Sequence, residues 1–140
     1  MVRRAEPSDA ETVAPLLAEL GYPCTAEDVR RRLREIESSA LDATFVAIAG
    51  GPVGLASVHL IRMFHLDAPV ARITSFVVAQ RVRRRGIGGL LLSTCELHAR
   101  ENGAAHLEVT SADRRADAHA FYVRHGYARE AQRFTKRLSY

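Results

Sequence analysis

Cysteine is scarce in this chain, and nothing in its spacing indicates a disulfide framework. Cys24 and Cys95 are isolated from one another, and in a cytosolic protein such a pair predicts two free thiols. The histidines show no spacing that would place a metal site on one element. They are His59, His65, His98, His106, His119 and His125. We therefore expect neither a structural disulfide nor a bound metal.

Long apolar runs are also absent. No segment approaches the roughly 18 apolar residues of a membrane helix, and Met1 to Pro7 lacks the apolar core of a signal peptide. We expect a cytoplasmic protein with no membrane partner. The 140 residues, 47% hydrophobic and 26% charged, are typical of a globular protein and predict a single domain over 1–140.

Lysine is almost absent, because Lys136 is the only one in the chain. The net charge of +4 therefore comes from arginine. A basic surface can attract nucleic acid or a phosphate-bearing ligand. However, the arginines lie among acidic neighbours, as in Glu27 to Glu35, which is typical of a solvated helix face and argues against nucleic acid.

The hydrophobic periodicity predicts alternating strands and helices. Strands are expected at 2–5, 43–49, 53–61, 73–78, 105–110 and 132–138, and helices at 8–20, 25–37, 87–102 and 116–124. The order strand, helix, strand across 73–110 implies a right-handed crossover between parallel strands. The fold class is α/β (α+β), with a mixed, mostly antiparallel central sheet of about six strands and helices on both faces.

A glycine-rich loop lies where the strand 73–78 gives way to the helix that begins at Ile87. A helix start has N–H groups without internal partners and a partial positive charge, and glycine lets a phosphate approach them. The loop is no Walker A motif, and Leu91 occupies the third glycine position of the dinucleotide fingerprint. A surface arginine run with a glycine turn is the alternative interpretation.

The pattern Arg83-x-x-Gly86-x-Gly88 resembles the Gln/Arg-x-x-Gly-x-Gly/Ala acyl-CoA pyrophosphate loop of the GCN5-related N-acetyltransferase (GNAT) family. Residues 118–127, Ala-His-Ala-Phe-Tyr-Val-Arg-His-Gly-Tyr, are similar to the family's Ala-x-x-Phe-Tyr-x-x-x-Gly-Phe/Tyr element. Two motifs in the expected order and on the expected elements identify the chain as a member of this family. Residues 110–122 and 133–136 also resemble a small-molecule subgroup that includes aminoalkylphosphonate acetyltransferases.

The resemblance implies acetyl-CoA as cosubstrate, held in a cleft where the strand ending at Val78 splays from the strand ending at Thr110. The loop's backbone N–H groups would hold the pyrophosphate, and 76–78 would pair with the pantetheine arm like an added strand. For Arg84 and Arg85 a solvated cation is the alternative. The implied cofactor-binding residues are Phe76, Val77, Val78, Arg83, Arg84, Arg85, Gly86, Ile87, Gly88, Gly89 and Tyr122.

The implied reaction moves the acetyl group to the primary amine of a small molecule, by direct attack and a tetrahedral intermediate. Tyr122 matches the family's tyrosine, and a phenol with a pKa near 10 can protonate the departing thiolate; packing is its alternative role. Relatives often carry a carboxylate in the strand before the loop, but here Thr74 and Ser75 occupy those positions. Glu108 is the first candidate for the base, unless it simply faces outward, and His119 is the second.

The acceptor end of the cleft is expected to include Tyr22, Phe64 and His65, which could equally close the local packing. Three other functions stay open: a peptide or protein N-acetyltransferase, an acyl-CoA-binding module without turnover, and a basic nucleic-acid-binding module. A homodimer through a sheet edge or helix face is compatible with the sequence.

Overall fold

The computed structural model describes residues 1–110, 116–130 and 134–139. Its strands form one sheet in the order β1-β2-β3-β4-β5, with β1 to β4 antiparallel to their neighbours and β5 parallel to β4. This confirms the mixed, mostly antiparallel sheet. The bounds are β1 (Val2–Arg4), β2 (Asp42–Ile48), β3 (Pro52–Ile61), β4 (Val70–Val78) and β5 (His106–Val109).

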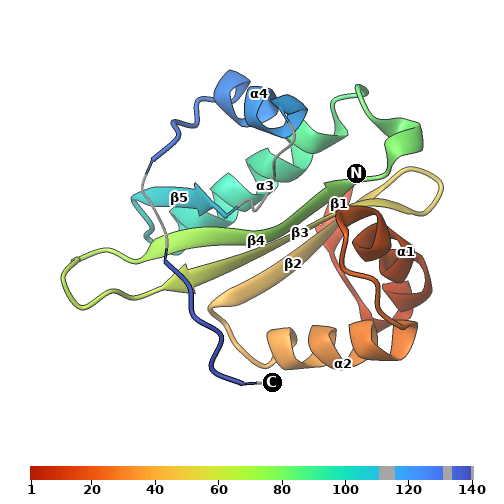
Figure 1. The fold of residues 1–140 in the computed structure, drawn as a ribbon, viewed down its shortest axis with the longest axis horizontal. Helices are drawn as coiled ribbons and strands as arrows, with labels where there is room; N and C mark the ends of the chain where they lie inside the picture. The colour runs from red at the N-terminus through yellow and green to blue at the C-terminus, as the bar shows by residue number, and fades with distance from the viewer. Residues whose placement is uncertain (111–115, 131–133, 140) are drawn as a thin grey trace.

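Helices cover both faces of the sheet, as the sequence predicts (Figure 1). Helices α1 and α2 lie on one side, and α3 and α4 on the other. Their bounds are α1 (Ala10–Leu20), α2 (Ala26–Glu37), α3 (Ile87–Glu101) and α4 (Ala116–Arg124), with 3-10 turns η1 (Pro7–Asp9) and η2 (Gln80–Val82). In the part of the chain that the structure describes, no helix has the length and apolar character of a membrane span.

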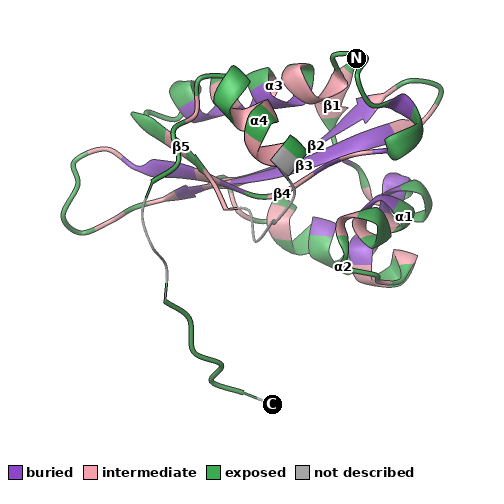
Figure 2. Ribbon diagram, turned by 45° about the horizontal axis from the view of Figure 1, so that its top comes forward, coloured by how far each residue is buried: buried purple, intermediate pink, exposed green. Residues whose placement is uncertain are grey.

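The core is formed by apolar side chains from both helix layers and the strands between them, drawn purple in Figure 2. Leu91 and Leu92 of α3 are almost fully buried, as is Val13 of α1. Cys95 is also buried, and burial raises the pKa of its thiol to about 12. Both cysteines are free thiols, which confirms the prediction.

The last predicted strand is the main difference from the expected sheet, which has five strands in the described residues rather than about six. Gln132 and Arg133, at its start, lie outside those residues. Residues 134–138 are assigned to no strand, and the side chains of Phe134 and Leu138 are 92% and 91% exposed. A strand needs a neighbour that completes its hydrogen-bond ladder, and the described residues after α4 pair with no strand of the sheet.

A buried histidine on α3 makes stability depend on pH. His98 is 7% exposed, packs edge-on against Phe45, and its Nε2 has no hydrogen-bond partner among the described residues. Burial, helped by the charge of Arg4 and opposed by Glu101, lowers the pKa of His98. As the pH falls below about 6.5, His98 therefore takes up a proton in the unfolded chain at a higher pH than in the folded chain. Stability falls as pH drops from there toward the lowered folded pKa.

We expect a slope of at most about 1.4 kcal/mol per pH unit from this one proton. Replacement of His98 by Leu is expected to reduce the change in the free energy of unfolding between pH 7 and pH 5, as measured by urea denaturation at each pH. His65→Gln, at an exposed position, is the control and keeps the wild-type slope. An unchanged slope in the His98 variant would contradict the assignment.

Candidate active site

The sheet opens between β4 and β5. The two strands pair in parallel only from Val70 to Ile73, and the Thr110 N–H closes the ladder by donating to the Ile73 carbonyl at 3.1 Å. Strand β4 then continues to Val78 with no residue of β5 beside it. This is the splay that the family resemblance implies, and it leaves one edge of 74–78 without a strand partner among the described residues.

A β-bulge marks the point of separation. In the register of β3 and β4, Val58 pairs with Ile73 and Ser57 with Ser75, so Thr74 is the extra residue. A bulge bends its strand and increases the local twist. The bulge at Thr74 therefore directs the rest of β4 away from β5.

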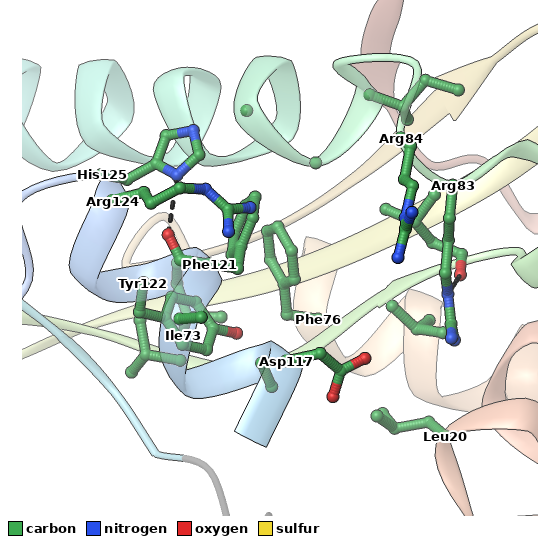
Figure 3. Close-up of a pocket in the computed structure, with 18 of the residues that line it drawn as sticks. Leu20, Ile73, Phe76, Arg83, Arg84, Asp117, Phe121, Tyr122, Arg124 and His125 are labelled. Carbon is green, nitrogen blue, oxygen red and sulfur yellow. Dashed lines mark hydrogen bonds between the residues drawn. The ribbon is translucent and has the colours of Figure 1, made fainter. Parts of the chain in front are cut away.

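A cavity of about 980 Å³ occupies this opening. Five segments line it: the end of α1 with the following turn, β4, the stretch from Val82 through the glycine loop, the end of β5 with Thr110, and α4 with His125. In Figure 3, Arg83 and Arg84 lie at one end of the cavity and Tyr122 at the other, with Phe76 between them. The sequence-predicted residues among the lining are Tyr22, Phe76, Val77, Val78, Arg83, Arg84, Gly86, Ile87, Gly88, Gly89 and Tyr122.

The glycine loop has the backbone conformation of a helix start exposed to a ligand. Gly86 is the N-cap of α3 with φ of 80°, a left-handed conformation that favours glycine, and Arg84 has φ of 67°. The first N–H groups of α3 have no acceptor within the helix. Since Ile87, Gly88 and Gly89 line the cavity, these donors and the helix dipole suit an anion. Arg83 also anchors the loop, because its Nε donates to the Val78 carbonyl at 3.1 Å.

Gly88 and Gly89 have a second role that the sequence did not indicate. A Cβ added at Gly88 would lie 3.1 Å from Cε2 and Cζ of Phe121, and one at Gly89 would lie 3.1 Å from Nε2 of His125. Both neighbours belong to the C-terminal end of α4 and the residue that follows it. These glycines therefore let α4 pack closely on the start of α3, in addition to leaving space for a ligand.

Tyr122 is held in a group of aromatic rings on the cavity wall. Its ring centroid lies 5.3 Å from that of Phe121 and 6.0 Å from those of Phe76 and Tyr127. The Tyr127 hydroxyl donates to Glu96 Oε2 at 2.8 Å, which ties this group to α3. Burial and the Glu96 carboxylate raise the pKa of Tyr127 far above its ordinary value, so Tyr127 stays protonated.

A chain of polar side chains crosses three strands and ends at the bulge. His59 Nδ1 is 2.8 Å from Asp42 Oδ1, and His59 Nε2 is 2.7 Å from Thr74 Oγ1. Ser57 Oγ lies 3.5 Å from the same Nε2 and 3.1 Å from Thr44 Oγ1. Thr74 lines the cavity. No motif in the sequence groups these side chains, and the pairing of Asp42 with His59 follows from the register of β2 and β3.

Comparison with known proteins decides the family. The family model described as the acetyltransferase (GNAT) family matches residues 11–127. The chain belongs to this family. An aminoalkylphosphonate N-acetyltransferase of Salmonella typhimurium is 40% identical over 91 residues, which cover 64% of this chain and 58% of that protein. The match thus spans less than two thirds of that relative's length.

Solved structures share the fold over nearly the whole chain. A transcriptional regulator from Bacillus halodurans has a TM-score of 0.89 at 22% identity, over 99% of both chains. A GNAT family acetyltransferase from Staphylococcus aureus has a TM-score of 0.82 at 25% identity, over 99% of this chain and 98% of that one.

The two predicted base candidates of this GNAT family member do not line the cavity. Glu108 Oε2 accepts from Arg72 Nε at 3.0 Å and Nη2 at 2.8 Å. Its side chain is 45% exposed, which fits the outward-facing carboxylate that was the alternative. His119 lies on α4 between Ala118 and Ala120, both of which line the cavity.

Three other predicted residues also lie away from the cavity. Arg85 is exposed in the loop. Phe64 and His65 belong to the exposed connection between β3 and β4, and Phe64 lines a separate small hollow with Arg62 and Met63. Of the predicted acceptor residues, the structure therefore brings only Tyr22 to the cavity. In the described residues, no group of three or more His, Cys, Asp or Glu side chains could hold a metal ion.

Proposed function

We propose that this GNAT family member transfers the acetyl group of acetyl-CoA to the primary amine of a small molecule. One observation carries the proposal. A single cavity combines the unpaired edge of β4, the free N–H groups at the start of α3 and the hydroxyl-bearing ring of Tyr122. These are an edge for an amide-containing arm, donors for a pyrophosphate and an acid for a leaving thiolate.

The cosubstrate would lie along β4 with its phosphates at the glycine loop. The N–H groups of Ile87 to Gly89 would receive the pyrophosphate, with Arg83 and Arg84 close enough to the same end of the cavity to add charge-assisted hydrogen bonds (Figure 3). The amides of pantetheine would pair with residues 76–78 as an added strand does. This direction carries the thioester toward the bulge at Thr74 and toward α4.

The acetyl transfer itself would be a direct attack. The amine nitrogen forms a bond to the thioester carbonyl carbon, the resulting oxyanion is stabilised by backbone N–H groups on the free edge of β4, and the carbon–sulfur bond then breaks. The thiolate takes a proton from the Tyr122 hydroxyl, since a phenol is protonated at neutral pH. The former amine nitrogen loses its extra proton to solvent as the amide forms, and the Tyr122 phenolate regains a proton from solvent.

The acceptor is proposed to be an aminoalkylphosphonate or a similar small amine with an anionic group. The relative of known activity in Salmonella typhimurium acts on this class. In this chain Arg124 lines the cavity at the end where Tyr122 lies (Figure 3), so a cation for a phosphonate is present there. Of the arginines that the sequence suggested for an anionic acceptor, Arg62 lines the separate hollow, and Arg114 and Arg133 lie outside the described residues.

A thiol-release screen tests the function. The chain is incubated with acetyl-CoA and, separately, with 2-aminoethylphosphonate, an amino sugar phosphate, a lysine-containing peptide and a peptide with a free N-terminus. We expect release of CoA and a matching acetylated product with the aminophosphonate. Turnover of peptides alone would favour the protein acetyltransferase instead. Acetyl-CoA binding without turnover of any amine would leave an acyl-CoA-binding module, and DNA binding that weakens steeply with salt would indicate a nucleic-acid-binding module.

Two further expectations stay predictions: the cytoplasmic location and the homodimer. Size-exclusion chromatography with light scattering would test the homodimer directly.

A further inference from the structure

We propose that Thr74, His59 and Asp42 form a proton relay that deprotonates the acceptor ammonium, which rests on the proposed acetyl transfer. A primary amine is mostly protonated at neutral pH, and only the neutral amine attacks a thioester. Thr74 and Ser75 stand where the family resemblance implies a carboxylate in β4, and Glu108 is engaged by Arg72 outside the cavity. The relay supplies the base that this strand otherwise lacks.

The hydrogen-bond chemistry determines which atom donates and which accepts at each step of the relay. An ionised carboxylate only accepts hydrogen bonds, so the 2.8 Å contact with Asp42 places a proton on His59 Nδ1. Nε2 of the neutral imidazole is then an acceptor, and the Thr74 hydroxyl donates to it at 2.7 Å. The remaining lone pairs of Thr74 Oγ1 are left for a donor on the cavity side. An ammonium N–H is such a donor.

The relay lies on the side of the sheet from which the acceptor amine would approach. A Cβ at Gly54 would meet Leu91 of α3, so position 54 of β3 faces α3. Because side chains alternate along a strand, His59 faces the opposite side of the sheet. Helices α1 and α2 cover that side. The cavity reaches that face through Leu20 and Tyr22, and it reaches the α4 face through Tyr122. An acceptor amine arriving from the α1 side would thus meet the relay, while the sulfur faces Tyr122.

The proton transfer balances without any further reactant. One ammonium N–H bond breaks as its proton passes to Thr74 Oγ1, and the Thr74 hydroxyl proton passes to His59 Nε2. Thr74 is a neutral hydroxyl before and after, and His59 becomes an imidazolium that the Asp42 carboxylate stabilises. The imidazolium later returns its proton to solvent. Histidine is suited to this because it exchanges protons near neutral pH.

Two charged residues are register partners of His59 in the sheet. Besides Asp42 of β2, Arg72 is its register partner on β4, and the charge of Arg72 is offset by the bond to Glu108 of β5. Helix α1 brings Glu19 to the cavity, where its carboxylate accepts from the Gln80 N–H. Helix α2 buries the apolar side chains of Val29 and Leu33.

The test compares pH–rate profiles of the full chain with an amine that the wild type acetylates. Thr74→Val and His59→Gln are each expected to lower kcat/KM for the amine about 100-fold near pH 7, with the Kd for acetyl-CoA unchanged. In both variants the rate should then rise about tenfold per pH unit, because only the free amine reacts. Thr74→Ser keeps the hydroxyl and is expected to restore most of the rate.

Thr94→Val is the matched control, since the Thr94 hydroxyl donates to the Leu90 carbonyl on α3 and does not line the cavity; this variant is expected to keep the wild-type profile. A His59→Gln enzyme with the wild-type pH profile overturns the relay alone. A wild type that binds acetyl-CoA and acetylates no amine overturns the proposed function, and the relay with it. Nitrogen-15 NMR of His59 adds a readout without turnover: a neutral ring with the proton on Nδ1 at pH 7 supports the relay, and a proton on Nε2 overturns it.

Discussion

Replacement of Tyr122 by Phe is expected to lower kcat by about 100-fold or more and to leave the Kd for acetyl-CoA unchanged. The substitution removes only the hydroxyl, and the ring keeps its contacts with Phe76, Phe121 and Tyr127. The departing thiolate would then lack its proton donor. Steady-state kinetics and a calorimetric titration of acetyl-CoA give the two quantities separately.

Tyr127→Phe is the matched control for this experiment. The Tyr127 hydroxyl belongs to the same group of rings but donates to Glu96 and does not line the cavity. Its loss is expected to cost about 1 kcal/mol of stability, with kcat unchanged. A Tyr122→Phe enzyme with the wild-type kcat would remove the proposed acid.

Replacement of Gly88 by Val is expected to weaken acetyl-CoA binding roughly 10- to 100-fold, the 1–3 kcal/mol typical of an overpacked site. Even the Cβ would lie 3.1 Å from the Phe121 ring and 3.8 Å from Val78 Cγ2. The larger side chain would displace α4 or occupy the cavity beside β4. Helix propensity cannot cause the loss, because Val is a better helix former than Gly. Calorimetry measures the affinity.

Two further variants identify the cause of the weaker acetyl-CoA binding. Ser93→Val places the same side chain on an exposed position of α3 and is expected to leave the Kd unchanged. Adding Phe121→Ala to Gly88→Val removes the ring that the new side chain meets and is expected to recover part of the affinity. If the double variant binds no better than Gly88→Val, steric conflict with α4 is not the reason.

Local features of the site could be predicted from the sequence because they depend on neighbours in the chain. The glycine loop needs only a strand end, a helix start and the left-handed residue Gly86 between them, and all three are found. The pairing of Asp42 with His59 could not be inferred from the turn at Gly50 and Gly51, because a bulge between Ala47 and Ile48 shifts the register of the hairpin by one residue.

Features that depend on distant segments could not be predicted. The bulge at Thr74 appears only in the register between β3 and β4, and without it nothing brings Thr74 to His59. The pairing of Glu108 with Arg72 depends on how β5 returns beside β4 after α3. The contact of α4 with Gly88 is likewise not predictable from either motif alone, although both motifs are present in the sequence. The sequence predicts a strand at 132–138, but a strand also needs a neighbour that completes its hydrogen-bond ladder, and no local pattern guarantees one.

Amide hydrogen exchange with and without acetyl-CoA tests the proposed site most directly, because it reports both binding and its place. We predict saturable binding that slows exchange of the amides in 76–78 along β4 and in 84–89 at the start of α3, with no comparable slowing in the 62–69 connection. Slowed exchange confined to other segments, or no binding of acetyl-CoA at all, would contradict the proposal that this cavity holds the acetyl donor.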